Sequence, residues 1–286
     1  MLLDELCNIG AIIMSLFKFT SQKNALDILQ NSRLLISNPK YFNDPFDSRV
    51  AVDDNDLEAK RLYNSWPRYP IPVGARGCYK NPHEDDLNRY SQLIEDAVSG
   101  ADIPEIEKWR IACFSRQTDW TKYIQMWSLY ADSHKGVMIE FNSDFEMYIR
   151  NTYEVSDVQY SNERVKITFQ DSLNDKTISE KRKKALTVKS KAWEYEKETR
   201  LIIPSYLFSK DEGSNLYCKM IEDSYRDFMR IDYKWISEIF CGAMMPQKEF
   251  DDIKTEAQKL SIKCTRLRLC AVKYELHDFA PNGCKN

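Results

Sequence analysis

The chain has 286 residues, of which 43% are hydrophobic and 12% aromatic, and its formal net charge is −3. This length and composition fit a globular protein that can bury a sizeable core. The small net charge excludes a strong overall attraction to nucleic acid, although it leaves room for local basic patches. The eight cysteines form no CxxC pair and no zinc-finger spacing, which is typical of a reducing cytosol and argues against a structural zinc site.

No stretch of the sequence is apolar over the roughly 18 residues that a membrane-spanning helix needs. Residues 8–17 are apolar, but Asp4 and Glu5 precede them where a signal peptide carries basic residues. We therefore expect a cytoplasmic protein with no membrane segment, in which residues 1–14 form a loosely attached extension.

The first part of the chain predicts a compact strand–helix–strand unit. Residues 15–20 alternate like a strand, and residues 22–31 carry an apolar stripe of helical period. Residues 33–37 predict a second strand, and residues 38–47 form a loop dense in turn formers. We expect five polar side chains to converge at one end of this unit: Lys18, Thr20, Asn43, Asp44 and Asp47. The alternative is that Asn43 and Asp44 only shape the turn before Pro45.

The middle of the chain is less regular. Residues 50–108, with a loop at 68–77 and a helix at 84–98, are interpreted as an insertion or lid. Strands are predicted at 111–115 and 137–141, on either side of an aromatic helix at 123–131.

Four residues in or after this aromatic helix need separate interpretation. Trp127 and Tyr130 either stack on a ligand or pack into the core, and core packing is the simpler interpretation. His134 is interpreted as a loop residue rather than a general base. Gly136 is predicted to be a left-handed residue after the helix.

The remaining elements are predicted from periodicity and turn signals. They are hairpin strands at 155–160 and 165–169, a basic helix at 178–191, a helix at 217–228, a strand at 236–242, a helix at 246–260, closing strands at 262–269 and 271–276, and a tail at 277–286. The basic helix carries six Lys and Arg residues, and such a run is normally a solvated face.

The stretch 191–204 is the most unusual in the chain. If it is extended, alternate side chains share one face, so that face carries Glu194, Glu196, Glu198 and Arg200. Three neighbouring carboxylates repel one another and are costly to bury. This face is therefore either solvated or part of a pocket that binds or polarises a ligand.

These patterns together predict an α+β fold: a single domain over residues 15–276, with a mixed or split β-sheet core and surrounding helices. The eight glycines form no P-loop and no Rossmann fingerprint, so a bound nucleotide must be held in another way.

Several motifs resemble, in the same order, a prokaryotic family known as domain of unknown function 2971. The more specific ones are Asn43-Asp-Pro-Phe-Asp47 and Trp193-Glu-Tyr-Glu-Lys-Glu-Thr-Arg200. The resemblance covers roughly residues 15–275. It implies a link with phage defence and a partner protein from a defence operon, and it implies no particular chemistry.

A more distant likeness is to ADP-ribosyltransferases, which hold NAD in the cleft of a split sheet. It implies that Lys18 and Thr20 occupy the early-strand position that binds NAD. Either Glu196 or Glu198 would then be the catalytic glutamate at the ribose, and the Glu196-Lys-Glu198 spacing matches a pair in which the earlier glutamate orients the acceptor. The remaining cofactor-binding residues would be Asn43, Asp44, Asp47, Trp127, Tyr130 and Arg200.

Three functions are compatible with these motifs and resemblances. The first is an NAD-consuming ADP-ribosyltransferase-like enzyme, a toxin or defence effector that needs no metal and modifies a protein or nucleic acid. The second is a non-catalytic protein that senses a ligand or binds a partner. The third is a nuclease that holds Mg²⁺ with Asp44, Asp47, Glu196 and Glu198.

Overall fold

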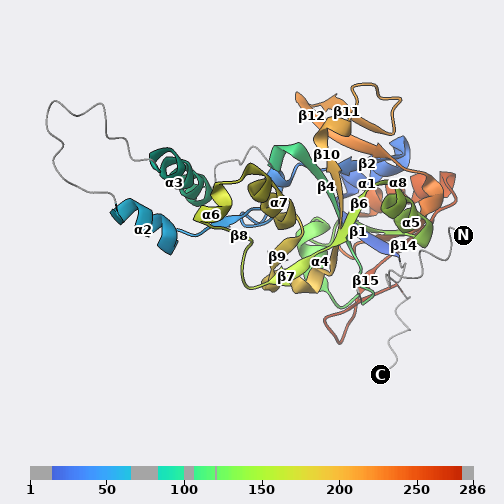
Figure 1. The fold of residues 1–286 in the computed structure, drawn as a ribbon. Helices are drawn as coiled ribbons and strands as arrows, with labels where there is room; N and C mark the ends of the chain where they lie inside the picture. The colour runs from blue at the N-terminus through green and yellow to red at the C-terminus, as the bar shows by residue number, and fades with distance from the viewer. Residues whose placement is uncertain (1–14, 66–82, 100–105, 120, 279–286) are drawn as a thin grey trace, which may run out of the picture. The chain divides into compact units, whose positions relative to one another are not determined.

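The computed structural model describes residues 15–65, 83–99, 106–119 and 121–278. The chain divides into two compact units, one formed by residues 1–37, 110–157 and 194–286 and the other by residues 38–109 and 158–193. The predicted α+β class with a mixed sheet is confirmed (Figure 1). The extension at 1–14, the loop at 68–77 and the tail beyond residue 278 lie outside the described residues.

A seven-stranded sheet forms the centre of the first unit. Its order is β14 (Lys263–Arg266), β13 (Ile236–Cys241), β5 (Val137–Phe141), β1 (Leu16–Thr20), β4 (Trp109–Ser115), β10 (Glu198–Pro204) and β6 (Glu154–Asp157). Strands β13 and β14 are parallel, whereas β5 is antiparallel to both of its neighbours and β6 is antiparallel to β10. The strands predicted at 15–20, 111–115 and 137–141 are confirmed, with β1 beginning one residue later than predicted.

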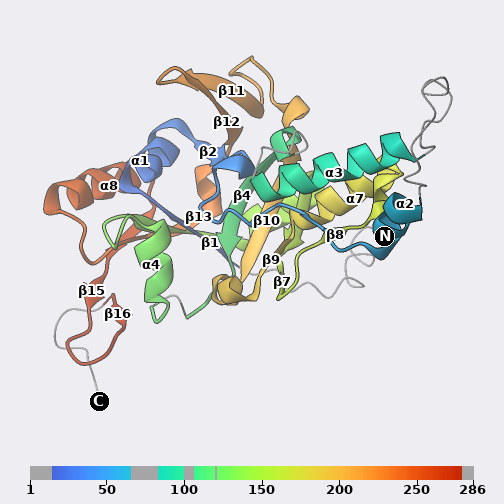
Figure 2. The ribbon, with the colours of Figure 1, turned by 90° about the vertical axis from the view of Figure 1, so that its left-hand side faces the viewer.

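Both faces of this sheet are covered. One face packs against α1 (Gln22–Asn31), α5 (Ser143–Thr152) and α8 (Gln247–Lys259), which bury Ile28, Phe145 and Ile253 with Leu16 of β1. Helices α1 and α8 lie side by side (Figure 2). The other face packs against α4 (Ile124–Tyr130), whose Trp127 joins the cluster of Phe17. Alternate residues of β1 therefore belong to different cores.

A smaller sheet in the first unit corrects one prediction. Residues 217–228 are not a helix: β11 (Leu216–Ile221) and β12 (Ser224–Arg230) form an antiparallel hairpin that pairs with β2 (Arg33–Ile36). The hairpin turns at Glu222 and Asp223, whose φ values are 49° and 62°. Such a turn usually contains Asn-Gly or Asp-Gly, and this one lacks the glycine that signals it in a sequence.

The acidic stretch is also arranged differently from the prediction. Residues Lys191–Glu196 form a 3-10 helix, η4, and Lys197 follows with a φ of 44°. The strand β10 begins only at Glu198, so Glu194 and Glu196 do not share a strand face with Glu198 and Arg200. The left-handed Lys197 separates the two glutamates of the predicted Glu196-Lys-Glu198 pair.

The second unit combines helices with two pairs of short parallel strands. The helices are α2 (Leu57–Ser65), α3 (Glu84–Ser99), α6 (Phe169–Ser172) and α7 (Asp175–Ala185). The strand pairs are β3 (Ala51–Val52) with β8 (Lys166–Ile167), and β7 (Gln159–Ser161) with β9 (Val188–Ser190). The predicted hairpin of strands 155–160 and 165–169 is therefore wrong. The predicted basic helix at 178–191 is shorter at its C-terminal end, because α7 ends at Ala185 and the chain then enters β9. The helix predicted at 84–98 is confirmed as α3.

The remaining elements are short. They are β15 (Arg268–Leu269), β16 (Leu276–His277) and the 3-10 helices η2 (Pro39–Tyr41), η3 (Ile106–Lys108), η5 (Ser205–Leu207) and η6 (Tyr233–Trp235). The closing strands predicted at 262–269 and 271–276 are thus only partly formed. None of the helices in the described ranges is long and apolar enough to cross a membrane.

The turn between α4 and β5 depends on glycine for a reason other than the predicted one. The left-handed residues are Asp132, Ser133 and His134, with φ values of 46°, 52° and 67°. Gly136 is needed because of close packing: a Cβ atom there would lie 2.3 Å from the carbonyl oxygen of Thr20. The turn after α4 is thus pressed against the end of β1.

We expect Gly136→Ala to lower the free energy of unfolding by about 2 kcal/mol, because backbone atoms must move to admit the methyl group. Gly213→Ala is the matched control, since its Cβ would meet only the flexible Asp211 side chain, at 3.2 Å. Urea denaturation of both variants measures the difference. Equal stabilities would contradict the close approach of Thr20.

Candidate functional site: a cationic cavity in the first unit

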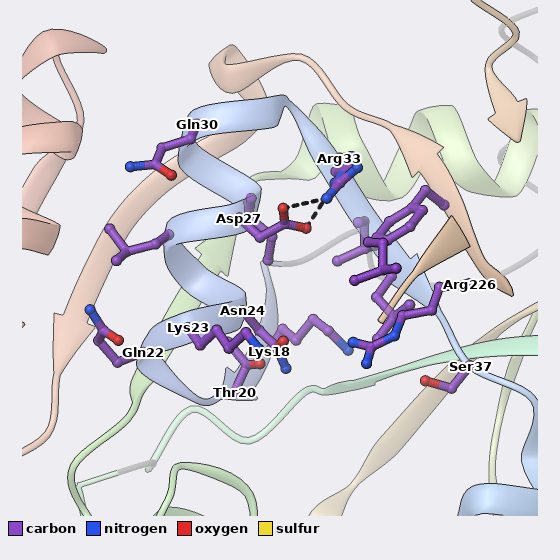
Figure 3. A pocket seen from close by; sticks show the side chains of 16 residues that line it. Lys18, Thr20, Gln22, Lys23, Asn24, Asp27, Gln30, Arg33, Ser37 and Arg226 are labelled. Atoms are coloured by element: carbon purple, nitrogen blue, oxygen red, sulfur yellow. Dashed lines mark hydrogen bonds and ion pairs between the residues drawn. The ribbon is translucent and has the colours of Figure 1, made fainter. Parts of the chain in front are cut away.

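A cavity of about 430 Å³ lies between α1, β2 and the β11–β12 hairpin (Figure 3). Four basic side chains line it, and Asp27 is the one acidic side chain among the described residues that do so. We call it the cationic cavity and define it by Lys18, Lys23, Arg33 and Arg226. Its apolar wall includes Leu34 and Phe228.

The start of helix α1 forms the rim of this cavity. Ser21 caps the helix by accepting a hydrogen bond from the Asn24 backbone N–H at 3.3 Å. Gln22, Lys23 and Asn24 of the first turn line the cavity, and that turn contains no acidic residue. The partial positive charge of a helix N-terminus therefore adds to the charge of the side chains.

Arg33 is held rigidly in the wall. Its Nε and Nη2 atoms donate to the Asp27 carboxylate at 2.8 and 2.6 Å, as the dashed lines in Figure 3 show. Its guanidinium lies 4.1 Å from the centre of the Phe228 ring. The hydrogen bonds to Asp27 raise the pKa of Arg33, while burial acts in the opposite direction. Arg33 thus stays charged, and its planar group is fixed before any ligand arrives.

Lys23 and Arg226 approach the cavity from different elements and share one exposed acidic partner. The Nζ atom of Lys23 lies 3.1 Å from Glu222, and Nη2 of Arg226 lies 3.6 Å from the same carboxylate. Glu222 is 65% exposed, so water screens both pairs and each contributes little stability. An anion in the cavity can compete for these two cations at small cost.

Lys18 differs from the other cations because it stands on a covered strand. Its ammonium donates to the carbonyl oxygen of Cys113 at 3.2 Å and lies 5.4 Å from the centre of the Phe114 ring. Burial lowers the pKa of Lys18, and the charges of Cys113 and Glu198 oppose this shift. Figure 3 shows its side chain extending into the cavity from the β1 side.

The predicted catalytic glutamates form a separate buried cluster. Glu198 accepts two hydrogen bonds from Arg200, from Nε at 2.8 Å and from Nη2 at 3.1 Å, and both side chains are buried. Tyr130 donates its hydroxyl to Glu196 at 2.6 Å. These carboxylates are thus engaged by a cation and a phenol, an arrangement that also fits a purely structural role.

Strand register decides which of these residues lie together. Lys18 pairs with Ile139, which belongs to the core on the α1 side. On β10, Leu201 belongs to the same core, so Glu198 and Arg200 leave the opposite face of the sheet. Among the described residues, Lys18 and Thr20 line the cavity, whereas Glu196, Glu198, Arg200, Trp127 and Tyr130 do not.

Trp127 is fully buried and meets Phe19 edge to face, with 5.2 Å between ring centres. This position agrees with the interpretation of Trp127 as a core residue. His134 donates to or accepts from Ser128, with 3.1 Å between Nε2 and Oγ, and burial lowers its pKa.

Asn43, Asp44 and Asp47 belong to the second unit. Asn43 is exposed, and Asp44 accepts a hydrogen bond from the Phe46 backbone N–H at 2.9 Å, as a turn-forming residue does. Asp47 is buried, accepts from Ser48 at 2.9 Å and lies 3.6 Å from Nζ of Lys189. Over the described ranges, no three His, Cys, Asp or Glu side chains gather as a metal site requires.

Sequence reasoning missed four charged residues of the cavity: Lys23, Asp27, Arg33 and Arg226. Asp27 and Arg33 carried a usable signal, because an acid on the last turns of a helix and a base on the next strand often meet. Arg226 was missed because residues 217–228 were predicted to be a helix. In the structure they form the β11–β12 hairpin, from which Arg226 lines the cavity.

Residues 126–201 match the model of a family described as protein of unknown function, DUF2971. Over these residues the match supports the resemblance to this family that the sequence motifs indicated, and it includes most of α4, all of η4 and the start of β10. No curated protein and no solved structure was found to match the chain.

Replacing Lys18 by methionine should leave the ligand-free protein at least as stable at neutral pH. A lowered lysine pKa means that the folded state disfavours the charged form, and this cost is fully present at every pH below the lowered pKa. The unfolded chain binds more protons between the lowered pKa and the ordinary value of 10.5, so the stability of the unmodified protein rises with pH in that window.

Urea denaturation across alkaline pH measures this effect. The rise should be smaller in Lys18→Met than in the unmodified protein, and Lys248→Met, which changes an exposed residue of α8, should retain it in full. An identical rise in all three proteins would contradict the assigned cost of charging Lys18.

Proposed function

We propose that the first unit binds a phosphate-bearing small molecule of nucleotide size in the cationic cavity, and that the protein acts as a sensor of this ligand. The observation that carries the proposal is the charge of the cavity wall. Lys18, Lys23, Arg33 and Arg226 line it, against the single carboxylate of Asp27. Guanidinium and ammonium groups are the side chains that most often bind phosphate.

The size and wall of the cavity support the same class of ligand. About 430 Å³ lies within the range of small-molecule sites. The partly exposed side chains of Leu35 and Ile221 offer an apolar surface to a base or similar ring, and the Asn24 side-chain amide at the rim can hydrogen bond to its polar edge. Arg33 is already fixed by Asp27, so binding does not have to order it.

Calorimetric titration of the full chain with AMP, ADP, ATP and NAD tests the proposal, with adenosine as the uncharged control. We expect binding of the phosphate-bearing compounds that weakens as salt rises, and no measurable binding of adenosine. Lys18→Met and Arg226→Met should each raise the Kd about tenfold or more, the effect of losing a hydrogen bond to a charged group.

Lys248→Met is the matched control because it removes an exposed cation outside the cavity. Its Kd should equal that of the unmodified protein. Binding of adenosine as tight as that of AMP, or an unchanged Kd in both cavity variants, would sink the proposal.

We propose consumption of NAD as a second candidate function, as an ADP-ribosyltransferase-like toxin or phage-defence effector. One observation favours it: Lys18 and Thr20, which the resemblance assigns to the NAD-binding strand, line the cavity. Glu198 leaves the opposite face of the sheet, so this function requires NAD to reach that face as well. In this reaction the bond between the ribose carbon and nicotinamide breaks, and nicotinamide leaves. A nucleophilic atom of water or of an acceptor then forms a new bond to the same carbon. A carboxylate stabilises the positive ribosyl carbon.

Nicotinamide release from NAD, with and without cell lysate, measures this activity. We expect Glu198→Gln to lower the rate at least a hundredfold, in line with the loss of an electrostatic stabiliser. Glu194→Gln, which changes an exposed residue of η4, should leave the rate unchanged.

Circular dichroism and the Kd for NAD show whether Glu198→Gln remains folded. NAD binding without any release would refute the enzyme and leave the binding proposal intact.

A further inference from the structure

A second cavity, of about 180 Å³, lies within the second unit. It is bordered by the ends of β7 and β9, by the chain after β7 and by residues before β3. Three basic side chains line it, and we define the arginine cavity by Arg49, Arg164 and Lys189. We propose that the arginine cavity binds a phosphate group, either as inorganic phosphate or as the terminal phosphate of a small molecule.

Arg164 carries a donor that the protein leaves unused. Its Nη2 donates to the carbonyl oxygen of Val50 at 2.8 Å, and its guanidinium lies 5.3 Å from the centre of the Phe46 ring. Its Nε is buried and has no hydrogen-bond partner. A buried unsatisfied N–H is costly, so this atom gains most from an acceptor in the cavity.

The cations of this cavity are held together against their repulsion. Burial lowers the pKa of Arg164, the charge of Arg49 lowers it further, and Asp44 opposes both effects. Lys189 is buried and lies 3.6 Å from Asp47. Like charges on a shared cavity are unfavourable in the empty protein and become favourable once an anion lies between them.

Two serine hydroxyls complete the set of donors. Ser161 of β7 and Ser190 of β9 are register partners, and both line the cavity. Each hydroxyl oxygen accepts a backbone hydrogen bond, from Glu163 at 3.0 Å and from Ala192 at 3.4 Å. This leaves each O–H to donate, as the oxygens of a phosphate require. The small volume suits one such group rather than a whole nucleotide.

The test must separate this site from the cationic cavity, which also attracts anions. We would titrate inorganic phosphate into full-length protein that carries Lys18→Met and Arg226→Met, by calorimetry. We expect one remaining site, whose Kd rises about tenfold or more on addition of Arg164→Met. Lys176→Met, an exposed residue of α7 in the same unit, is the control and should leave the Kd unchanged.

Arg49→Met provides a second readout. It removes one of the three cations of the cavity, so it should raise the Kd for phosphate about tenfold, while circular dichroism shows that the variant is folded. If Arg164→Met unfolds, the effect of Arg49→Met on the Kd decides the proposal.

Three outcomes would overturn the inference. They are no phosphate binding in the double variant, an unchanged Kd in the Arg164 and Arg49 variants, and acetate binding as tightly as phosphate. In a final arm, a phosphomonoester that binds more tightly than inorganic phosphate would identify the small-molecule source, and the reverse order would identify free phosphate. Because these variants lie outside the cationic cavity, failure here leaves the proposed function untouched.

Discussion

Strand β1 lies in the interior of the seven-stranded sheet and is covered on both faces, and this constraint governs the rest of the first unit. Each of its side chains must enter one of two cores or reach a cavity. Leu16 and Phe17 each enter a core. Lys18 reaches the cavity, because an ammonium group inside the core would lose its hydration without compensation. In the cationic cavity the Cys113 carbonyl oxygen supplies part of that compensation by accepting a hydrogen bond from Lys18.

The same constraint separates two groups of residues that the sequence suggests belong together. Side chains on β1 and β10 alternate between the faces, so the Lys18 and Glu198 side chains leave the sheet in opposite directions. The buried pair of Glu198 and Arg200 then stands beside α4, where Tyr130 engages Glu196. Removing either partner of the Glu198–Arg200 pair would leave an uncompensated charge in the core, so the pair constrains β10 whatever its part in function.

Much of the fold could be predicted from the sequence, because local patterns determine local elements. The apolar stripe over residues 22–31 gave α1 its correct bounds, the alternation at 15–20 gave β1, and the short apolar runs at 111–115 and 137–141 gave β4 and β5. The failures arose where tertiary contacts override the pattern. The β11–β12 hairpin turns without glycine, and the acidic stretch is divided by a left-handed Lys197 that no propensity indicates.

The candidate site was predicted less well than the fold. Lys18 and Thr20 were recognised on the early strand, but Arg33 and Arg226 reach the cavity through a sheet whose pairing was not foreseen. Polar residues that only shape turns, such as Asp44, look the same in a sequence as ligand-binding residues. The structure distinguishes the two kinds of residue, because the side chain of a turn-forming residue already accepts a hydrogen bond from a nearby backbone N–H, as Asp44 does.

The division of the chain between the two units has a consequence for the order in which the protein folds. The pairing of Lys18 with Ile139 joins residues roughly 120 positions apart, and such distant pairings slow the search for the native sheet. During synthesis β1 must wait for β5, and β5 in turn lacks its other neighbour until β13 has emerged. Over that interval the apolar faces of β1 and β5 are exposed, as is the edge of β5. The seven-stranded sheet, whose β1 contributes Lys18 to the cationic cavity, is therefore among the last parts of the chain to become protected from aggregation.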